Sequence, residues 1–455
     1  MYYYNVRRMI ILLFVLFYLI SNFCNSTAAA NIYRVLLIIA IMLGISRLPR
    51  VNFIICTGLF VLGGIILYVN GATVQDWFKA VSNNAGLIAL FITAPLMGMP
   101  FFYGEYEKDL KNLMQSNMKS PLIFCVFIFV VTHILGIVIM IGAVPLVYGI
   151  FIGTARLLKL EKPFMTAILR GYVATGFWSP IWASTAAVNA SLKLSWLSIV
   201  PYGIFYALVS LAISALFQYY EQTRNSEKNY HMMKDQDVNQ KANVKWSSII
   251  TMLILFASLI FLIILFDLFT SWQLLIIIPV VSLLFPLASA IVTRKMPAYK
   301  RGLLQYYEKN LLKTNNEVIL FAAAGFLGKS LEIAKVSAYV PRLIPDWFVQ
   351  YPFISIIIIC TFMIIVSLTG VHPVVTGSSL LGAIDPAMLN FSPLIFGLVI
   401  ILGWSSAILI SPFSATNLIA SGLTGEACWN ISLRNNGIYG VVVTIIIAFL
   451  ITLSL

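Results

Sequence analysis

Charged side chains are scarce in this chain of 455 residues: Asp, Glu, Lys and Arg together make up 10%, whereas 60% of the residues are hydrophobic. Soluble domains carry about a quarter of their residues as charges, which they need to cover a water-facing surface. The mean hydropathy of +0.95 agrees with this contrast. The composition therefore excludes a soluble protein and predicts an all-α polytopic membrane protein with about 10–13 hydrophobic helical segments.

Motifs for catalysis and metal binding are also missing. The five cysteines form no CxxC pair and no zinc-ligand spacing, so neither a disulfide framework nor a metal centre is expected. The sequence contains no HExxH, GxSxG, Walker A or Rossmann fingerprint. We therefore expect no enzymatic activity. Without a nucleotide-binding domain, any uphill transport would have to use an ion gradient.

Acidic residues are few beside basic ones, 16 against 29, which gives a net charge of +13. The basic residues fall mostly in short loops between apolar runs, where they set the orientation of a membrane protein, so nucleic acid is not an expected partner. The loop that holds Arg294, Lys295, Lys300 and Arg301 is predicted to be cytoplasmic. The lipid bilayer, and the cell membrane in particular, is the expected location.

The chain divides at its longest hydrophilic stretch. Arg7 and Arg8 precede an apolar run that ends in small residues, which fits either a signal peptide or a first transmembrane helix; we favour the helix because the rest of the chain is membrane-embedded. The predicted organisation is an N-terminal helix or signal anchor, a first transport unit, a linker and a second unit, at residues 1–30, 31–220, 221–245 and 246–455.

Two polar stretches interrupt otherwise apolar segments. ISPFSATNLIASG begins at Ile410, and the weaker copy SPIWASTAAVNAS begins at Ser179. Each holds a Ser-Pro pair, further hydroxyls and one Asn. Polar, broken backbone persists inside a membrane only where it lines a cavity or is buried in protein, and a pair of such breaks in two halves of a chain predicts a transporter's binding site.

An internal repeat is predicted from shared landmarks in the two halves. Gly98 and Gly328 close similar apolar helices, and the Ala-Ser pair at Ala190 lies at the same separation from the pair at Ala420. Each half also places a histidine between these landmarks, His133 and His372. A duplicated transport unit has this order of features.

Side chains at and near the breaks are the candidate ligands. Carbonyl, hydroxyl and amide oxygens suit a sodium ion, which we assign to Ser179, Asn189, Ser411, Ser414 and Asn417. Helix starts and hydroxyls suit a substrate, which we assign to Thr369, His372, Thr376, Ser378, Ser184, Thr185 and Thr416. His372 either binds substrate or a proton, or caps a helix. Arg170 either reaches the membrane interface or pairs with substrate.

Three stretches resemble the ion transporter superfamily, which includes divalent anion/sodium symporters and arsenite-efflux permeases. EVILFAAAGFLGKSLE resembles the helix before the family's second hairpin, SLTGVHPVVTGSSL stands at the hairpin tip, and ISPFSATNLIASG resembles its unwound helix. In this comparison Asn417 and Asn189 fall on corresponding asparagines. The resemblance implies two inverted repeats with re-entrant hairpins and broken helices, an elevator-like motion and a homodimer.

The tips carry Thr369-Gly370-Val371-His372 and Thr132-His133 in place of the family's Ser-Asn-Thr, so no dicarboxylate substrate is predicted. We expect an ion-coupled secondary transporter, driven by sodium or protons, for a small anionic solute. The alternatives are an efflux permease or cation/proton antiporter of the same fold, and a non-transporting membrane component of an envelope or polymer-export assembly. The sequence does not identify the solute.

Overall fold

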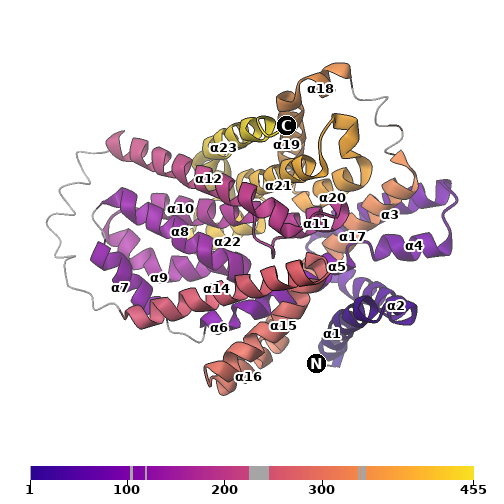
Figure 1. Cartoon of the computed structure of the whole chain (residues 1–455), viewed down its shortest axis with the longest axis horizontal. Coiled ribbons are helices and arrows are strands. Elements are labelled where there is room, and N and C mark those ends of the chain that lie inside the picture. The colour runs from indigo at the N-terminus through magenta and orange to yellow at the C-terminus, as the bar shows by residue number, and fades with distance from the viewer. Residues whose placement is uncertain (1, 103–105, 118–119, 225–244, 337–338, 340–344) are drawn as a thin grey trace.

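The computed structural model of the chain describes residues 2–102, 106–117, 120–224, 245–336, 339 and 345–455. Every regular element in these ranges is helical (Figure 1). Ten helical segments among them are long and apolar enough to cross a membrane. The predicted all-α, polytopic membrane class is confirmed. Most of the predicted linker, residues 225–244, lies outside the described residues.

The N-terminal segment forms a helical hairpin. Its helices are α1 (Tyr2–Phe23) and α2 (Thr27–Gly44), and Ser26 caps α2 by accepting a hydrogen bond from the Ala29 N–H. Arg8 near the start of α1 donates to the Glu308 carbonyl at 2.6 Å. At the other end of α1, the ring of Phe23 contacts that of Trp272, with centroids 4.9 Å apart. The predicted N-terminal apolar segment is therefore a helix packed along the bundle.

The first half continues with helices that reach the predicted linker. They are α3 (Arg50–Val69), α4 (Val74–Val81), α5 (Ala85–Thr93), α6 (Met99–Phe102), α7 (Tyr106–Asn117), α8 (Pro121–Ile139), α9 (Ala143–Leu157), α10 (Glu161–Ala174), α11 (Ala183–Leu192) and α12 (Trp196–Arg224). Short 3-10 turns η1 (Ile45–Arg47), η2 (Ala94–Gly98), η3 (Met140–Gly142) and η4 (Thr175–Phe177) join some of them.

The second half follows the linker. Its elements are α14 (Trp246–Phe269), α15 (Leu274–Val292), α16 (Met296–Gln305), η5 (Tyr306–Asn310), η6 (Leu311–Thr314), α17 (Asn315–Ile333), α18 (Asp346–Gln350), α19 (Pro352–Leu368), α20 (Pro373–Ala383), η9 (Pro386–Leu389), α21 (Pro393–Ile410), α22 (Ala415–Thr424), η10 (Asn430–Arg434) and α23 (Asn435–Thr452).

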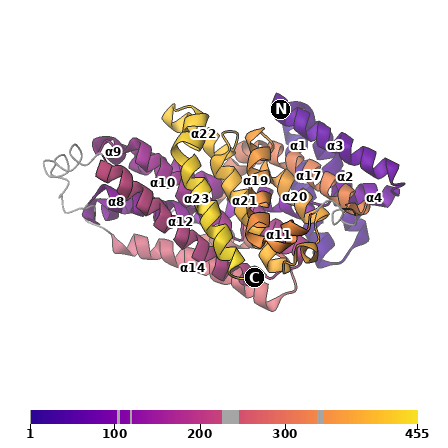
Figure 2. The same cartoon turned by 90° about the horizontal axis from the view of Figure 1, so that it is seen from above.

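The two halves share an order of packed elements. In the first, α8 and α9 precede the interrupted helix α10–α11, and α8 lies along α10. In the second, α19 and α20 precede the interrupted helix α21–α22, and α19 lies along α21. Figure 2 shows α11, α19, α20 and α21 gathered in the middle of the molecule. The repeat and the inverted orientation of its halves stay predictions.

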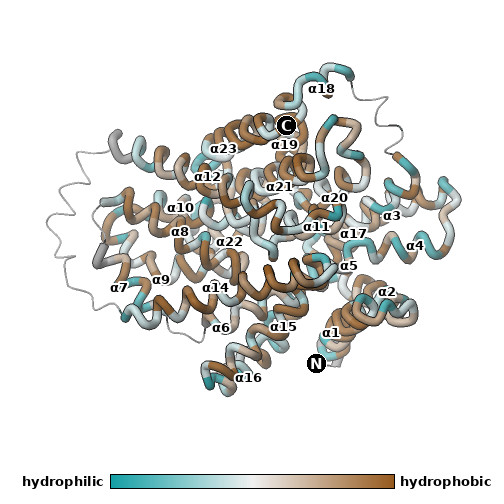
Figure 3. Tube along the Cα trace, viewed as in Figure 1, coloured by the Kyte–Doolittle hydropathy of each residue, from teal (hydrophilic) through white to brown (hydrophobic). Residues whose placement is uncertain are grey.

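The outer helices expose apolar side chains, as a lipid-facing surface requires. Phe261 on α14 and Leu208 on α12 are 65% and 58% exposed, and Figure 3 shows both helices as mostly hydrophobic. By contrast, α21 is apolar on all sides and almost every one of its residues is buried. A helix that is hydrophobic all round belongs in the interior. Helix α21, which ends at the second interruption, is therefore central, and it packs against α10 and α11 on either side of the first interruption.

Candidate functional site

The first interruption separates α10 from α11. The chain leaves helical geometry after η4, and the Gly176 carbonyl loses its partner within the helix. Ser184 and Thr185, in the first turn of α11, donate to this carbonyl at 3.5 and 3.4 Å. All three residues are buried. The start of one half-helix thus bonds the backbone that the break leaves open.

The second interruption separates α21 from α22, at Ser411 and Pro412. The side-chain amide of Asn417 donates to the carbonyls of Leu409 at 3.0 Å and of Ser411 at 2.8 Å. The Ser414 hydroxyl caps α22 by accepting from the Asn417 N–H at 3.3 Å. Because Asn417 lies in α22 and its acceptors lie at the end of α21, this one side chain joins the two half-helices.

Thr185 and Asn417 occupy the same place in the two breaks, since each is the third residue of its second half-helix. The sequence comparison instead aligned Asn189 with Asn417. The structure places Asn189 near the other end of α11, where its side-chain oxygen accepts from the Leu274 N–H at 3.1 Å and its amide donates to the Leu194 carbonyl. Asn189 therefore joins α11 to α15 and is not brought to the first break.

Several buried polar atoms near the breaks have no hydrogen-bond partner. They are the Ser179 hydroxyl, the Trp182 indole N–H, the Ser405 hydroxyl and the Asn417 side-chain oxygen. A buried polar atom without a partner costs about 1–3 kcal/mol. Two of the four belong to the predicted cation ligands. Among the described residues, no group of three or more His, Cys, Asp or Glu has metal-binding geometry, so only neutral oxygens are offered there.

The tip of the α19–α20 hairpin meets the second break. The Ser411 hydroxyl donates to the Ser367 carbonyl at 2.7 Å, near the end of α19. Thr369 follows, exposed, with its hydroxyl bonded to the Val366 carbonyl at 2.7 Å. His372 caps α20, because its Nδ1 accepts from the Val374 N–H at 3.1 Å. The sequence predicted that His372 either binds substrate or a proton, or caps a helix. The hydrogen bond to Val374 is a helix cap.

The remaining predicted substrate ligands are divided between α20 and α22. Thr376 is buried and its hydroxyl donates to the Pro373 carbonyl at 3.1 Å. Thr416 is buried in the first turn of α22. Ser378 accepts from the Asn84 amide at 3.4 Å and lines a polar cavity. Of the site residues predicted from the sequence, Ser378 is the one found among the described lining residues of that cavity.

His133 links helices through both of its ring nitrogens. Its Nδ1 lies 3.2 Å from the Gly171 carbonyl, and its Nε2 lies 3.1 Å from the Trp178 indole nitrogen. The carbonyl can only accept and the indole N–H can only donate, so the imidazole is neutral with its proton on Nδ1. The histidine therefore ties α8 to α10 and to the first break.

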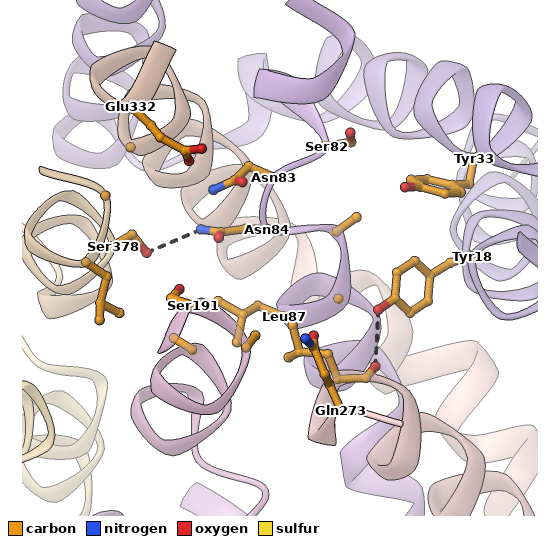
Figure 4. Close-up of a pocket in the computed structure, with 18 residues that line it drawn as sticks. Tyr18, Tyr33, Ser82, Asn83, Asn84, Leu87, Ser191, Gln273, Glu332 and Ser378 are labelled. Atoms are coloured by element: carbon orange, nitrogen blue, oxygen red, sulfur yellow. Dashed lines mark hydrogen bonds between the residues drawn. The ribbon is translucent and has the colours of Figure 1, made fainter. Parts of the chain in front are cut away.

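A polar cavity of about 460 Å³ lies between helices from both halves of the chain (Figure 4). It is bounded by α1, α2, the α4–α5 connection, α11, α17, α20 and the start of α15. Its polar side chains are mainly amides and hydroxyls, from Tyr18, Tyr33, Ser82, Asn83, Asn84, Ser191, Gln273 and Ser378. Glu332 is the one formally charged side chain among the described lining residues, and Lys329 contacts it at 2.5 Å.

Asn84 stands at the centre of this cavity wall. Its amide donates to the Phe321 carbonyl at 3.0 Å as well as to Ser378, so it joins α5 to α17 and α20. Gly325 permits this approach, because a Cβ there would lie 2.7 Å from the Asn84 side chain. Sequence reasoning missed Asn84. The signal that could have revealed it is the polar Ser-Asn-Asn run directly before a fully apolar helix.

Two helix starts face the cavity. Residues Gly86 and Leu87 of α5 and Leu275 of α15 line it. The N-cap side chain of α5 does not cap that helix, whereas at the start of α15 the Asn189 side-chain oxygen already accepts from the Leu274 N–H. Helix starts carry partial positive charge on N–H groups that have no partner within the helix. The described lining residues include no basic side chain. The positive groups that face the cavity are therefore backbone N–H donors.

The cavity lies at the opposite end of α15 from the basic loop. The Tyr18 hydroxyl donates to the Leu275 carbonyl at 3.4 Å, at the start of α15. The helix ends at Val292, next to Arg294 and Lys295. Its length places the two ends about 27 Å apart, close to the thickness of a bilayer's hydrocarbon core.

These features define a multi-pass, all-α membrane protein with two interrupted helices in its interior. No protein-family profile and no curated protein sequence matches the chain. A solved structure, that of the Alcanivorax borkumensis YdaH transporter, is described as having an unusual topology. It superposes with a TM-score of 0.43 and 14% identity over 83% of this chain and 88% of that one. A superposition of this quality identifies neither family nor function, and membership of the ion transporter superfamily stays a prediction.

Proposed function

We propose that the protein is an ion-coupled secondary transporter that moves a small anionic solute across the cell membrane. The observation that carries this proposal is the pair of interruptions, α10–α11 and α21–α22, in the buried centre of the molecule. Irregular backbone inside a membrane protein needs partners in the protein or a water-filled site. Transporters use paired broken helices of this kind to hold substrate and coupling ions.

The cavity supports the choice of a small solute. Its volume of about 460 Å³ lies within the range of about 300–1,000 Å³ that small-molecule sites span. The start of α5, which has no side-chain cap, supports an anionic group, since helix starts bind carboxylates and oxyanions through backbone N–H groups. Amides and hydroxyls around it would bind the uncharged parts of the solute.

Neutral oxygens support sodium as the coupling ion. The Asn417 side-chain oxygen and the Ser179 hydroxyl are buried and lack partners, and Ser411 and Ser414 lie in the same interruption as Asn417. Sodium would take such oxygens without needing a carboxylate. A proton-coupled mechanism would instead require a titratable group, for which His372 at the hairpin tip is the candidate.

The test is transport by the purified protein in proteoliposomes. We expect a member of a panel of small carboxylates and oxyanions to accumulate when an inward sodium gradient is imposed, and to leak without accumulating when the gradient is collapsed. A thermal-stability screen with the same panel selects the solute beforehand. Stable protein that shows neither a ligand-dependent thermal shift nor flux with any gradient would favour the non-transporting alternative.

The direction of transport is tested in inverted vesicles. Accumulation there, driven by a pH gradient alone, would support the efflux or antiport alternative. Sodium-driven uptake in right-side-out vesicles would support symport.

A further inference from the structure

A buried arginine lies one turn before the first interruption. Arg170 on α10 is 2% exposed. Its Nε donates to the Asn436 side-chain oxygen at 3.0 Å, and its two terminal nitrogens donate to the Asn435 carbonyl at 3.1 Å and to the Ser214 hydroxyl at 3.5 Å. The guanidinium also covers the Tyr439 ring at 4.2 Å. All of these partners are neutral.

No carboxylate pairs with Arg170 in the part of the chain that the structure describes. Two acidic residues belong to neighbouring elements. Glu426 accepts from the side chain of Asn435 at 3.1 Å, and Glu221 is exposed near the end of α12. Neither forms an ion pair with the guanidinium, and Glu221 acts on it only through a longer-range electrostatic interaction. Burying a cation without an anion costs several kcal/mol even after relaxation, and neutral dipoles and an aromatic ring recover part of that cost.

Beside Arg170 is a second, much smaller cavity. It is lined in part by Ser210, Ser405, Ser406 and Tyr439, and its volume of about 10 Å³ is the room that one water-sized species needs. It shares no lining residue with the large cavity. A polyatomic solute does not fit it. A chloride ion, which is slightly larger than a water molecule, would fit once the surrounding side chains move apart slightly.

The hydroxyl protons around this small cavity can be assigned. Thr444 donates to the Gly440 carbonyl at 2.7 Å, so Ser406, 2.7 Å from the Thr444 hydroxyl, donates to Thr444. The Tyr439 hydroxyl donates to the Ser210 carbonyl at 3.0 Å and accepts from the Ser210 hydroxyl at 2.5 Å.

Ser405 is different, because its hydroxyl is fully buried and has no partner. Its O–H and one N–H on each terminal nitrogen of Arg170 remain available as donors. These groups come from α21 and α10, so an acceptor between them would join the two helices.

We propose that Arg170 and Ser405 bind one monovalent anion of halide size, for which chloride is the biological candidate. The anion neutralises the buried guanidinium and accepts from the Ser405 hydroxyl. It fixes α10 to α21 next to the first interruption, on the side of α23. This site does not depend on the proposed transport of a solute, and its test needs neither solute nor gradient.

The experiment is a halide titration of the full-length protein in detergent. Chloride replaces gluconate at constant sodium concentration and ionic strength while the unfolding temperature is recorded, and bromide is titrated separately. We expect a saturable rise in unfolding temperature with both halides. Ser405→Ala, which removes no existing hydrogen bond, should raise the half-saturating halide concentration about tenfold through loss of one donor to a charged acceptor.

Arg170→Gln should abolish the saturable rise, while Arg156→Gln, the same change at an exposed position, should leave it intact. If Arg170→Gln does not fold, Ser405→Ala and the wild type decide the question. The proposal is overturned if the wild type shows no saturable halide effect, as when the cavity holds only water. It is also overturned if either variant of the site responds to halide as the wild type does.

Discussion

At the scale of single residues, the second interruption depends on Asn417. Its amide bonds carbonyls at the end of α21, and its side-chain oxygen is left over in a fully buried position. One short side chain thus satisfies the broken backbone and still presents a free oxygen. The equivalent Thr185 bonds the Gly176 carbonyl but has no amide, so the two breaks are similar in geometry and different in chemistry.

Asn417→Ala should lower the free energy of unfolding by about 2–4 kcal/mol, because buried carbonyls lose their donor. It should also abolish gradient-driven uptake in proteoliposomes. Chemical denaturation and flux measurements check the two effects separately. Asn70→Ala, at an exposed helix end, is the matched control and should change neither. Uptake at the wild-type level in folded Asn417→Ala would remove this residue from the proposed site.

Asn189→Ala tests whether Asn189 binds a cation, as the sequence alignment predicted, or joins α11 to α15, as its contacts in the structure indicate. Because Asn189 joins α11 to α15, we expect the variant to lose about 1–3 kcal/mol of stability while uptake keeps its dependence on sodium concentration. Initial uptake rates at increasing sodium measure this. A rise of tenfold or more in the half-saturating sodium concentration would instead support the cation role that the sequence predicted.

At the scale of elements, the fold depends on helices that approach closely at glycine. On α10, a Cβ at Gly171 would lie 2.4 Å from the Phe129 carbonyl oxygen of α8. Backbone cannot yield locally as a flexible side chain can, so the whole helix would have to move. The hydrogen bond between His133 and the Gly171 carbonyl also joins α8 to α10. Its length depends on the separation of these two helices.

Gly171→Ala and Gly422→Ala should therefore differ in their effect on the free energy of unfolding. The first should destabilise the protein by about 1–3 kcal/mol through overpacking. The second, in α22 with open space around its Cβ, should be neutral or stabilise by up to about 1 kcal/mol, because alanine favours helix over glycine. Unfolding temperatures of the two purified variants check this. Equal effects would contradict the packing of α8 on α10.

At the scale of the whole molecule, the large cavity and the basic loop occupy opposite ends of α15. The positive-inside rule places the loop in the cytoplasm, so the cavity should face the other side of the membrane. The homodimer, the elevator-like motion and the two-unit division of the chain that the resemblance or the linker implied stay predictions at this scale.

Asn83→Cys and Lys300→Cys test that orientation in a Cys24→Ser background. Asn83 lines the cavity and Lys300 is exposed in α16. A membrane-impermeant maleimide should label the first in intact cells and the second only after permeabilisation. The Cys24→Ser background alone should stay unlabelled, because the remaining cysteines are buried or partly buried. The reverse pattern would mean that the protein is inserted the other way.

The sequence alone determined the class of protein and the position of its two interruptions. Few charges and long apolar runs leave a chain no stable place in water, and Ser-Pro pairs followed by further Ser, Thr and Asn residues favour a break in the helix near Pro180 and Pro412. These are properties of composition and of neighbouring residues. They do not depend on how the helices pack.

The tertiary structure decided which polar groups meet. It brought Asn84 from before α5 to Ser378 on α20, carried Asn189 away from the break it was aligned with, and buried Arg170 among neutral partners beside Ser405. Such pairings join residues far apart in the chain. Helical periodicity sets which face a side chain occupies, but its partner depends on the rotation and register of the facing helix, and these follow from the packing of the whole bundle.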